Sequence, residues 1–282
     1  MTEGEAAPAA VAGQGTRNLL MRVIAALVLA PAAIAIAYAG GWPWAVLVTL
    51  AAIGLYVEWS TIVGAAPRMP VVASGTAGLA IAGGCLALGR IEAALVALAL
   101  GLVVVALLSR ERRSWAAAGF GYAAAAELAS ILIRRDPAAG WTALIMVLLV
   151  VWVTDIGGYF AGRGLGGPKL WPRISPNKTW AGAIGGFAAS VAVAAAFAAV
   201  GVGRTGPLLL LGSVLSVASQ LGDLFESAVK RRFGVKDSSR IIPGHGGLLD
   251  RLDGFVAAVV LAALFGLLRG GVDGVGSGVM VW

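Results

Sequence analysis

Two stretches of this chain combine acidic, basic and glycine residues in a pattern that suits metal-assisted phosphate chemistry. Within residues 220–253, Asp223 and Glu226 are three residues apart, as are Asp250 and Asp253. On a helix this spacing places both members of a pair on one face. Converging carboxylates repel each other unless a cation joins them, and oxygen-only ligands suit Mg²⁺, which completes its shell with water and substrate phosphates. The sequence therefore predicts a magnesium site built from these acids.

The same stretch supplies cations for phosphate groups. Its basic residues are too many for the anchoring of one loop at the lipid headgroups, although anchoring explains any single one of them: Lys230, Arg231, Lys236, Arg240 and Arg251. Asp237 lies among them, and the only histidine, His245, lies in a glycine-rich turn. Glycines let backbone amides approach an oxyanion without a Cβ in the way. A lone histidine is more often structural, so a contact between His245 and substrate phosphate remains one of two alternatives.

The other polar stretch, residues 152–180, contains Asp155, Ser175 and Lys178. Ser175 precedes a proline, which favours a helix N-cap whose free N–H groups bind phosphate beside Lys178. Plain helix capping explains Ser175 equally well. Asp155 lies eight residues before Arg163, about 12 Å along a helix. If Arg163 marks the level of the lipid headgroups, Asp155 lies at the edge of the hydrocarbon core. A carboxylate there needs a cation nearby, either a substrate-site cation or a structural Arg or Lys of a neighbouring helix.

The elements that must position these residues are membrane helices. Of the 282 residues, 59% are hydrophobic and 12% are charged, whereas soluble domains carry about 25% charged residues. A membrane-spanning helix needs about 20 apolar residues. We predict an all-α, polytopic integral membrane protein in which residues 1–16 form a disordered tail, 17–282 form one membrane domain and 141–269 form its catalytic part. The nine predicted spans are 19–39, 42–60, 70–89, 91–108, 116–133, 141–160, 179–201, 206–225 and 252–269.

The first span has a second interpretation. Arg17 and Arg22 precede an apolar run that ends in Ala37-Tyr38-Ala39, which also fits a signal-peptide cleavage site. The run is long for a signal peptide and acidic residues occur in its leader. We therefore expect the first span to be retained.

Alternation of nine spans collects 16 of the 21 basic residues on one side of the membrane. Basic loops stay cytoplasmic, so the N-terminus is predicted inside and both polar stretches at the cytoplasmic face of a bacterial-type inner (plasma) membrane. The net charge of +7 then suits anionic headgroups and phosphates. No nucleic-acid motif is visible, and we expect no nucleic acid partner.

Residues 227–253, SAVKRRFGVKDSSRIIPGHGGLLDRLD, resemble without a gap the signature of the phosphatidate cytidylyltransferase family. Residues 174–182, ISPNKTWAG, together with Asp155, are similar to that family's other characteristic block. The resemblance covers about 141–269, whereas the N-terminal spans match only in hydropathy. Asn177 stands where many relatives carry Lys, a departure that bears on substrate contact.

The resemblance implies that CTP and phosphatidic acid react to give CDP-diacylglycerol and pyrophosphate, with Mg²⁺ and with K⁺ as a second cation. It also implies a homodimer surrounded by membrane lipids. Asp223 and Asp250 match the metal-centre carboxylates. The other matched positions have less definite roles: Lys230, Arg231, Lys236, Asp237, His245, Arg251 and Asp253. We predict a catalytic role for Asp223, Asp250, Lys230, Arg231, His245 and Asp253. Substrate binding is predicted for Asp155, Ser175, Lys178, Glu226, Lys236, Asp237 and Arg251.

Two rival functions fit parts of this pattern. A related CTP-dependent nucleotidyl- or phosphotransferase would act on an isoprenoid lipid. A transporter would also carry acids within its spans, but it would place them near the bilayer midplane on discontinuous helices. The acids of this chain cluster at one face, which favours the enzyme.

Overall fold

The computed structural model describes residues 30–65, 69–239 and 246–282. In this part of the chain, eight helices are long and apolar enough to cross a membrane. They are α2 (Gly41–Ile62), α3 (Met69–Ala87), α4 (Ile91–Leu108), α5 (Arg113–Arg135), α6 (Gly140–Leu165), α7 (Trp180–Ala199), α8 (Thr205–Arg232) and α9 (Leu249–Gly270). A shorter helix covers Ala30–Ala39, and α10 (Val275–Met280) follows α9. The predicted all-α membrane fold is confirmed.

Each predicted span from the second to the ninth coincides with one of the eight long helices. Most of the first predicted span, and the predicted tail at 1–16, lie outside the described residues, which begin at Ala30. The structure also adds one small element that hydropathy does not predict. Strands β1 (Lys169–Trp171) and β2 (Ser175–Thr179) form an antiparallel hairpin between α6 and α7.

Two helices extend well beyond the spans predicted from hydropathy. The span 206–225 corresponds to α8, which continues to Arg232, and the span 141–160 corresponds to α6, which ends at Leu165. A helix of 28 residues is about 42 Å long, more than the roughly 30 Å hydrocarbon core. Hydropathy shows where the apolar run ends at the first charged residues. The backbone hydrogen bonds of the helix continue past that point into water. Lys230 and Arg231 therefore lie on a helix and not in a loop beyond it, and Glu226 lies on the helix face that its spacing predicts.

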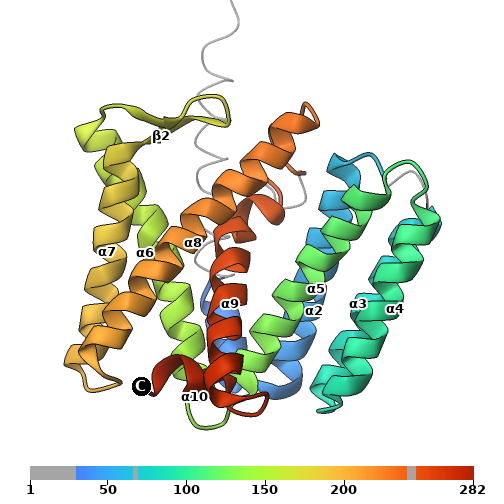
Figure 1. Cartoon of the computed structure of the whole chain (residues 1–282), viewed down its shortest axis with the longest axis horizontal. Coiled ribbons are helices and arrows are strands. Elements are labelled where there is room, and N and C mark those ends of the chain that lie inside the picture. Colours follow the sequence, from blue (N-terminus) through green and yellow to red (C-terminus); the bar gives the residue numbers. More distant parts are fainter. Residues whose placement is uncertain (1–29, 66–68, 240–245) are drawn as a thin grey trace, which may run out of the picture.

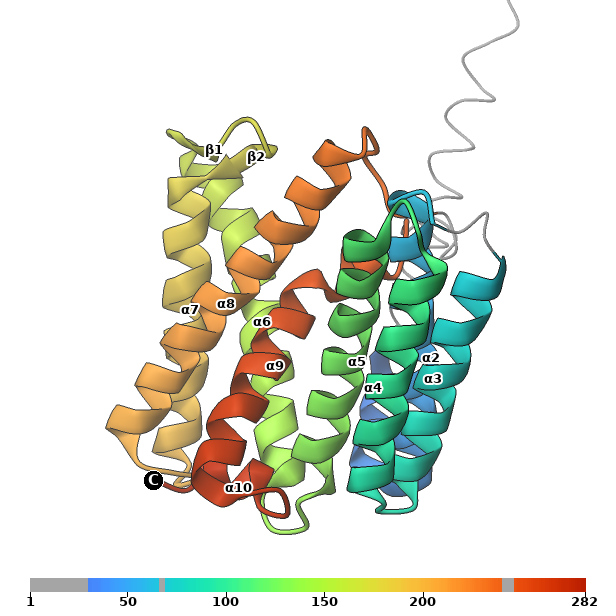
Figure 2. The ribbon, with the colours of Figure 1, turned by 45° about the vertical axis from the view of Figure 1, so that its right-hand side comes forward.

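The helices run side by side as a bundle, with the hairpin standing at one end beside α6 and α7 (Figure 1). α8 crosses the bundle at an angle in front of α6, and α9 lies between α8 and α5 in both views (Figure 2). Helices α2, α3, α4 and α5 form the other half. The C-terminal end of α8 and the hairpin share one end of the bundle, and α10 lies at the other. The basic residues of the described chain divide between these two ends as alternation of the spans predicts.

Small residues bring α6 and α7 close together. A Cβ on Gly182 would lie 2.8 Å from the Gly158 carbonyl oxygen, and one on Gly186 would lie 2.5 Å from that of Thr154. Such close backbone approach is typical of small residues at helix interfaces in membranes. The Thr154 hydroxyl also lies 2.5 Å from Ser190 Oγ on α7 and 3.0 Å from Ser216 Oγ on α8. Three helices are thus fixed to one another directly beside Asp155.

A second close crossing joins α8 to α9. A Cβ on Gly222 would lie 2.6 Å from the Asp253 carbonyl oxygen, and one on Gly254 would lie 2.5 Å from Ser219 Oγ. Asp223 follows the first of these glycines and Asp253 precedes the second. The crossing therefore places both acids at the closest approach of the two helices.

The end of the bundle opposite the hairpin is fastened by Asp136. This residue, 3% exposed, accepts hydrogen bonds from the backbone amides of Ala138 at 2.8 Å and Ser277 at 2.5 Å. Burial alone would raise the pKa of the Asp136 carboxyl, but these hydrogen bonds outweigh burial and lower it below its usual value. Asp136 thus joins the turn between α5 and α6 to α10.

Replacing Asp136 with asparagine is expected to lower the free energy of unfolding at pH 7 by about 2 kcal/mol, because hydrogen bonds to a charged acceptor are lost. A lowered folded-state pKa stabilises the protein above the unfolded pKa of about 3.9, and this contribution disappears as the pH falls through the folded value. Thermal unfolding in detergent should therefore separate the two proteins at pH 7, and the difference should shrink progressively as the pH falls below about 4. An unchanged difference at low pH would contradict the assignment.

Candidate active site

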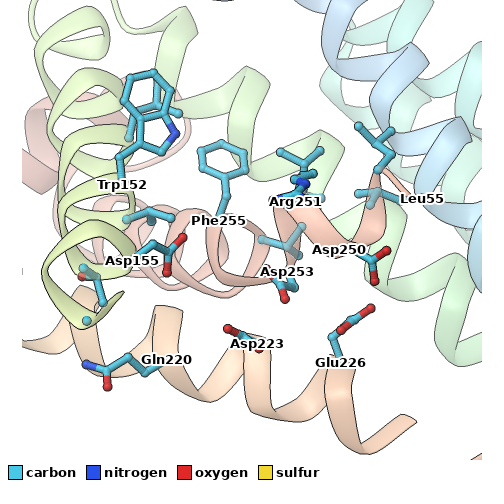
Figure 3. A pocket seen from close by; sticks show the side chains of 18 of the residues that line it. Leu55, Trp152, Asp155, Gln220, Asp223, Glu226, Asp250, Arg251, Asp253 and Phe255 are labelled. Carbon is cyan, nitrogen blue, oxygen red and sulfur yellow. The ribbon is translucent and has the colours of Figure 1, made fainter. Parts of the chain in front are cut away.

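A cavity of about 1360 Å³ lies between the two halves of the bundle, and six acidic residues line it. One of them, Glu127, comes from α5. Asp155 comes from α6, Asp223 and Glu226 come from α8, and Asp250 and Asp253 come from α9. Figure 3 shows Asp223 and Asp253 facing each other, with Asp155 on the neighbouring helix, while Glu226 and Asp250 point toward one another a turn further along. The two close helix crossings described above hold these elements together.

Lys178, on β2, reaches the first group of acids. Its Nζ forms an ion pair with Asp223 Oδ2, and about 30% of each of these two side chains is exposed. Asp155 opens onto the same cavity, and among the described residues no lysine or arginine lies within ion-pair distance of it. A carboxylate within a membrane-spanning helix is costly without a cation. Among the described residues, Lys178 is thus the cation with an ion pair to this first group.

Lys230, on α8, lies at the centre of the second group. Its Nζ is 2.6 Å from Asp250 Oδ1 and 2.7 Å from Glu226 Oε2. The other oxygen of Asp250 accepts hydrogen bonds from the backbone amides of Ser238 at 3.1 Å and Gly247 at 3.0 Å. Glu226 is 1% exposed, and its Oε1 accepts no hydrogen bond from the described residues. One lysine thus serves two carboxylates and leaves a buried oxygen available.

The donor atoms of this cavity fit a hard divalent cation. Its acidic side chains supply carboxylate oxygens, which Mg²⁺ prefers, and Oε1 of Glu226 has no bound donor among the described residues. In that part of the chain no three acid, histidine or cysteine side chains converge closely enough to form a complete ligand cage. Mg²⁺ usually takes one or two carboxylates and fills its shell with water and substrate phosphates, so an incomplete protein cage suits it.

Away from the acids, the cavity becomes apolar. Its wall there includes Trp44, Leu55, Val151, Trp152 and Phe255, which come from three of the membrane helices. The volume exceeds the roughly 300–1,000 Å³ of pockets for single drug-sized ligands. The cavity can therefore hold a polar molecule beside the acids and an apolar one against the helices.

The chain matches the model of the cytidylyltransferase family over residues 20–268. It belongs to this family. A phosphatidate cytidylyltransferase of Brucella suis biovar 1 (strain 1330) is 43% identical over 259 residues, which cover 89% of this chain and 94% of the relative. The enzyme of the same name from Bacillus subtilis (strain 168) is 48% identical over 128 residues, 45% of this chain and 48% of the relative. That of Staphylococcus haemolyticus (strain JCSC1435) is 42% identical over 174 residues, 59% and 66% of the two chains.

Most residues that the sequence analysis selected meet in the cavity of this cytidylyltransferase-family protein. The predicted residues that line it are Asp155, Lys178, Asp223, Glu226, Lys230, Asp250, Arg251 and Asp253. His245 lies outside the described residues. Asp223 and Asp250, predicted to share a metal ion, line the same cavity, but each is paired with a different lysine.

Four predicted site residues do not line this cavity: Ser175, Arg231, Lys236 and Asp237. Lys236 and Asp237 are exposed beyond the end of α8. The guanidinium Nε of Arg231 donates to the Ile174 carbonyl oxygen at 3.3 Å. Arg231 thus fastens the hairpin to α8, and through the hairpin it supports Lys178.

The predicted helix N-cap at Ser175 is wrong. Ser175 lies in β2, and α7 begins only at Trp180, where Thr179 is the N-cap and its hydroxyl accepts a hydrogen bond from the Gly182 amide at 3.1 Å. Proline fixes φ near −65°, which suits an edge strand as well as a first helical turn. The Ser-Pro pair therefore did not discriminate between the two, and Lys178 is presented by a strand.

The polar lining residues that the sequence analysis missed include Glu127, Tyr159, Arg163 and Gln220. Arg163 Nη1 donates to the Tyr159 hydroxyl at 3.1 Å on the same helix. Gln220 Nε2 donates to the Ala183 carbonyl oxygen at 3.3 Å, across to α7. Gln220 could have been found, because it precedes Asp223 by three residues and so shares its helix face.

Proposed function

We propose that this protein transfers the cytidylyl group of CTP to phosphatidate, with CDP-diacylglycerol and pyrophosphate as products. One observation carries the proposal most directly: a single cavity has carboxylates and lysines at one end and membrane-helix side chains at the other. A triphosphate needs the polar end, whereas a diacylglycerol lipid needs both. Membership of the cytidylyltransferase family and the names of the similar proteins agree with it.

In the reaction, a phosphate oxygen of phosphatidate attacks the α-phosphorus of CTP. The bond from this phosphorus to the oxygen that bridges to the β-phosphate breaks, and its electrons leave with pyrophosphate. The nucleophile is already an anion, so no strong general base is required. The protein must bring two anions together and neutralise the charge that develops on the leaving group, which is largely positioning and electrostatics.

The chain's own residues can meet these demands. Lys178 and Lys230 place ammonium groups among the carboxylates, and the exposed guanidinium groups of Arg163 and Arg251 also line the cavity. Fixed cations of this kind hold phosphate oxygens in line. The apolar wall at Leu55 and Phe255 keeps the acyl chains out of water. CTP would thus be held at the polar end, whereas phosphatidate would extend from the apolar wall to that end.

Asp223 and Asp250 are the proposed Mg²⁺ ligands, and K⁺ is the proposed second cation. Asp155, Glu226 and Asp253 line the same cavity. Bound there, Mg²⁺ would supply charge neutralisation at the phosphates of CTP. Lys178 and Lys230 neutralise these acids in the structure. Their ammonium groups would become available for phosphate when another cation takes over that role.

The proposal includes a location and an assembly. The basic end of the bundle would face the cytoplasm of a bacterial inner membrane, because basic loops stay on that side. CTP would then enter from the cytoplasm and phosphatidate from the inner leaflet. A homodimer is proposed from the resemblance of the sequence alone.

Purified protein in detergent, given labelled CTP, phosphatidate and Mg²⁺, should form CDP-diacylglycerol and release pyrophosphate. A parallel set of reactions with isoprenoid phosphates and isoprenoid alcohols tests the rival acceptors. Omission of Mg²⁺ with a chelator present should stop the reaction. Product formation only with an isoprenoid acceptor would replace the proposed function with the rival one.

A further inference from the structure

Glu58 is a buried carboxylate in α2, in the N-terminal half of the chain. Its side chain is 1% exposed. Oε1 accepts hydrogen bonds from Ser239 Oγ at 2.6 Å and the Leu248 amide at 2.8 Å. Oε2 accepts from Ser238 Oγ at 2.8 Å and the Leu249 amide at 2.7 Å. Four donors, from residues about 180 to 190 positions away, thus converge on one side chain.

These donors belong to the two segments that hold Asp250. The backbone amides of Ser238 and Gly247 both donate to Asp250 Oδ2, at 3.1 and 3.0 Å. Ser238 therefore donates its hydroxyl to Glu58 and its amide to Asp250. Glu58 and Asp250 bind the same two stretches of chain, one on each side of residues 240–245. A shift at Glu58 must move the amides that orient Asp250.

Glu58 also occupies the N-terminal end of α9. Leu248 is the N-cap residue of this helix and Leu249 its first residue. Amides at a helix start have no partner within the helix, and an anion there is favoured by the helix dipole. The first residues of α9 after Leu249 include Asp250, Arg251 and Asp253. Glu58 therefore sets where the helix that presents these side chains begins.

Glu58 itself is not a lining residue of the cavity. The Trp59 ring beside it stacks on Tyr122 of α5 and on Phe225 of α8, with ring centroids 5.5 and 6.0 Å apart. This aromatic layer holds the end of α2 against α8, next to Asp223 and Glu226. The position of Glu58 is thus fixed by the four donors to its carboxylate and by the aromatic contacts of the neighbouring Trp59. A residue that orients other residues must itself be held in place.

We propose that Glu58 is a positioning residue of the active site: it fixes residues 238–239 to residues 248–249 and thereby orients Asp250 and the first turn of α9. The inference rests on the proposed function. It assigns the N-terminal half of the bundle a part in orienting the active site, beyond membrane anchoring.

The test compares Glu58→Gln with Asp136→Asn. Both changes remove the charge from a buried carboxylate that accepts backbone amides, but Asp136 lies at the opposite end of the bundle. Glutamine keeps one acceptor oxygen and turns an NH₂ group toward other donors. Loss of a hydrogen-bond partner that orients the ligands of a metal ion typically costs about 10–100-fold in activity. Glu58→Gln should lower kcat by about 10-fold or more with a small change in the KM for phosphatidate, whereas Asp136→Asn should leave kcat within about twofold.

Amide hydrogen exchange, measured on the purified variants without metal or nucleotide, provides a readout that does not depend on turnover. Glu58→Gln should speed exchange in peptides that cover 235–239 and 246–253, and Asp136→Asn should speed it only near 138–139 and 275–280. If Glu58→Gln does not fold, Glu58→Asp, which keeps the charge but is one methylene shorter, takes its place in the same comparison.

A kcat for the Glu58 variant equal to that of Asp136→Asn, or unchanged exchange at 246–253, would overturn the positioning role. An inactive wild type would count against the proposed function instead. The exchange measurement would still decide whether Glu58 orders the start of α9.

Discussion

Replacing Asp223 with asparagine is expected to lower kcat by about 10³-fold or more while the protein still inserts and folds. Asparagine keeps the size of the side chain and one acceptor oxygen but removes the charge that a metal ligand supplies. A bound metal ion contributes several kcal/mol of transition-state stabilisation, and each 1.36 kcal/mol is a factor of ten in rate. Formation of CDP-diacylglycerol by the purified variant, followed across a Mg²⁺ titration, measures the effect.

The matched control is Asp273→Asn. Asp273 lies at the opposite end of the bundle, where its 93% exposed side chain is 4.0 Å from Arg135. A surface pair of this kind contributes little to stability, so kcat should remain near that of the wild type. Near-normal activity of Asp223→Asn would rule out the metal role of this residue. The proposed Mg²⁺ site at Asp223 and Asp250 would then be wrong.

The active-site acids could be predicted from the sequence because helix geometry fixes them. Asp223 and Glu226 share a face of α8 by their spacing, and Asp250 and Asp253 share one of α9. Hydropathy placed these helices in the membrane, and the resemblance selected the acids among other charged residues. What brings the two helices together, the crossing at Gly222, has no signal in a single sequence. The sequence shows that a span contains a glycine, but not which helix packs against it.

Glu58 could not be assigned for a related reason. Its partners lie about 180 to 190 positions later in the chain, and no local pattern connects residues so far apart. The available signal was the residue type, since an acid close to a predicted span is costly unless it has partners. Hydropathy alone treats that position as the end of the span 42–60. The error at Ser175 was local by contrast, because Ser-Pro is compatible with both a strand and a helix start.

The crossing of α8 and α9 leads to the second large expected effect. Replacing Gly222 with alanine should lower kcat by about 10²-fold, because a Cβ there would lie 2.6 Å from the Asp253 carbonyl oxygen and 2.7 Å from the Ala257 Cβ. Both contacts are too short, so the helices must move apart. Asp223 adjoins Gly222 on one helix and Asp253 faces it from the other, so one displacement shifts both acids. Displacements near 1 Å can cost about 10²-fold.

Gly212→Ala separates this effect from overpacking in general. Gly212 also lies on α8, ten residues before Gly222 and so about 15 Å away along the helix, and a Cβ there would lie 2.7 Å from the Ala194 Cβ on α7. Both variants should lose about 1–3 kcal/mol of stability, visible as a lower thermal midpoint in detergent. Only Gly222→Ala should also lose turnover per folded molecule. Equal activity of the two variants would mean that the site tolerates movement between α8 and α9. Metal binding and phosphate transfer would then not depend on a fixed spacing of Asp223 and Asp253.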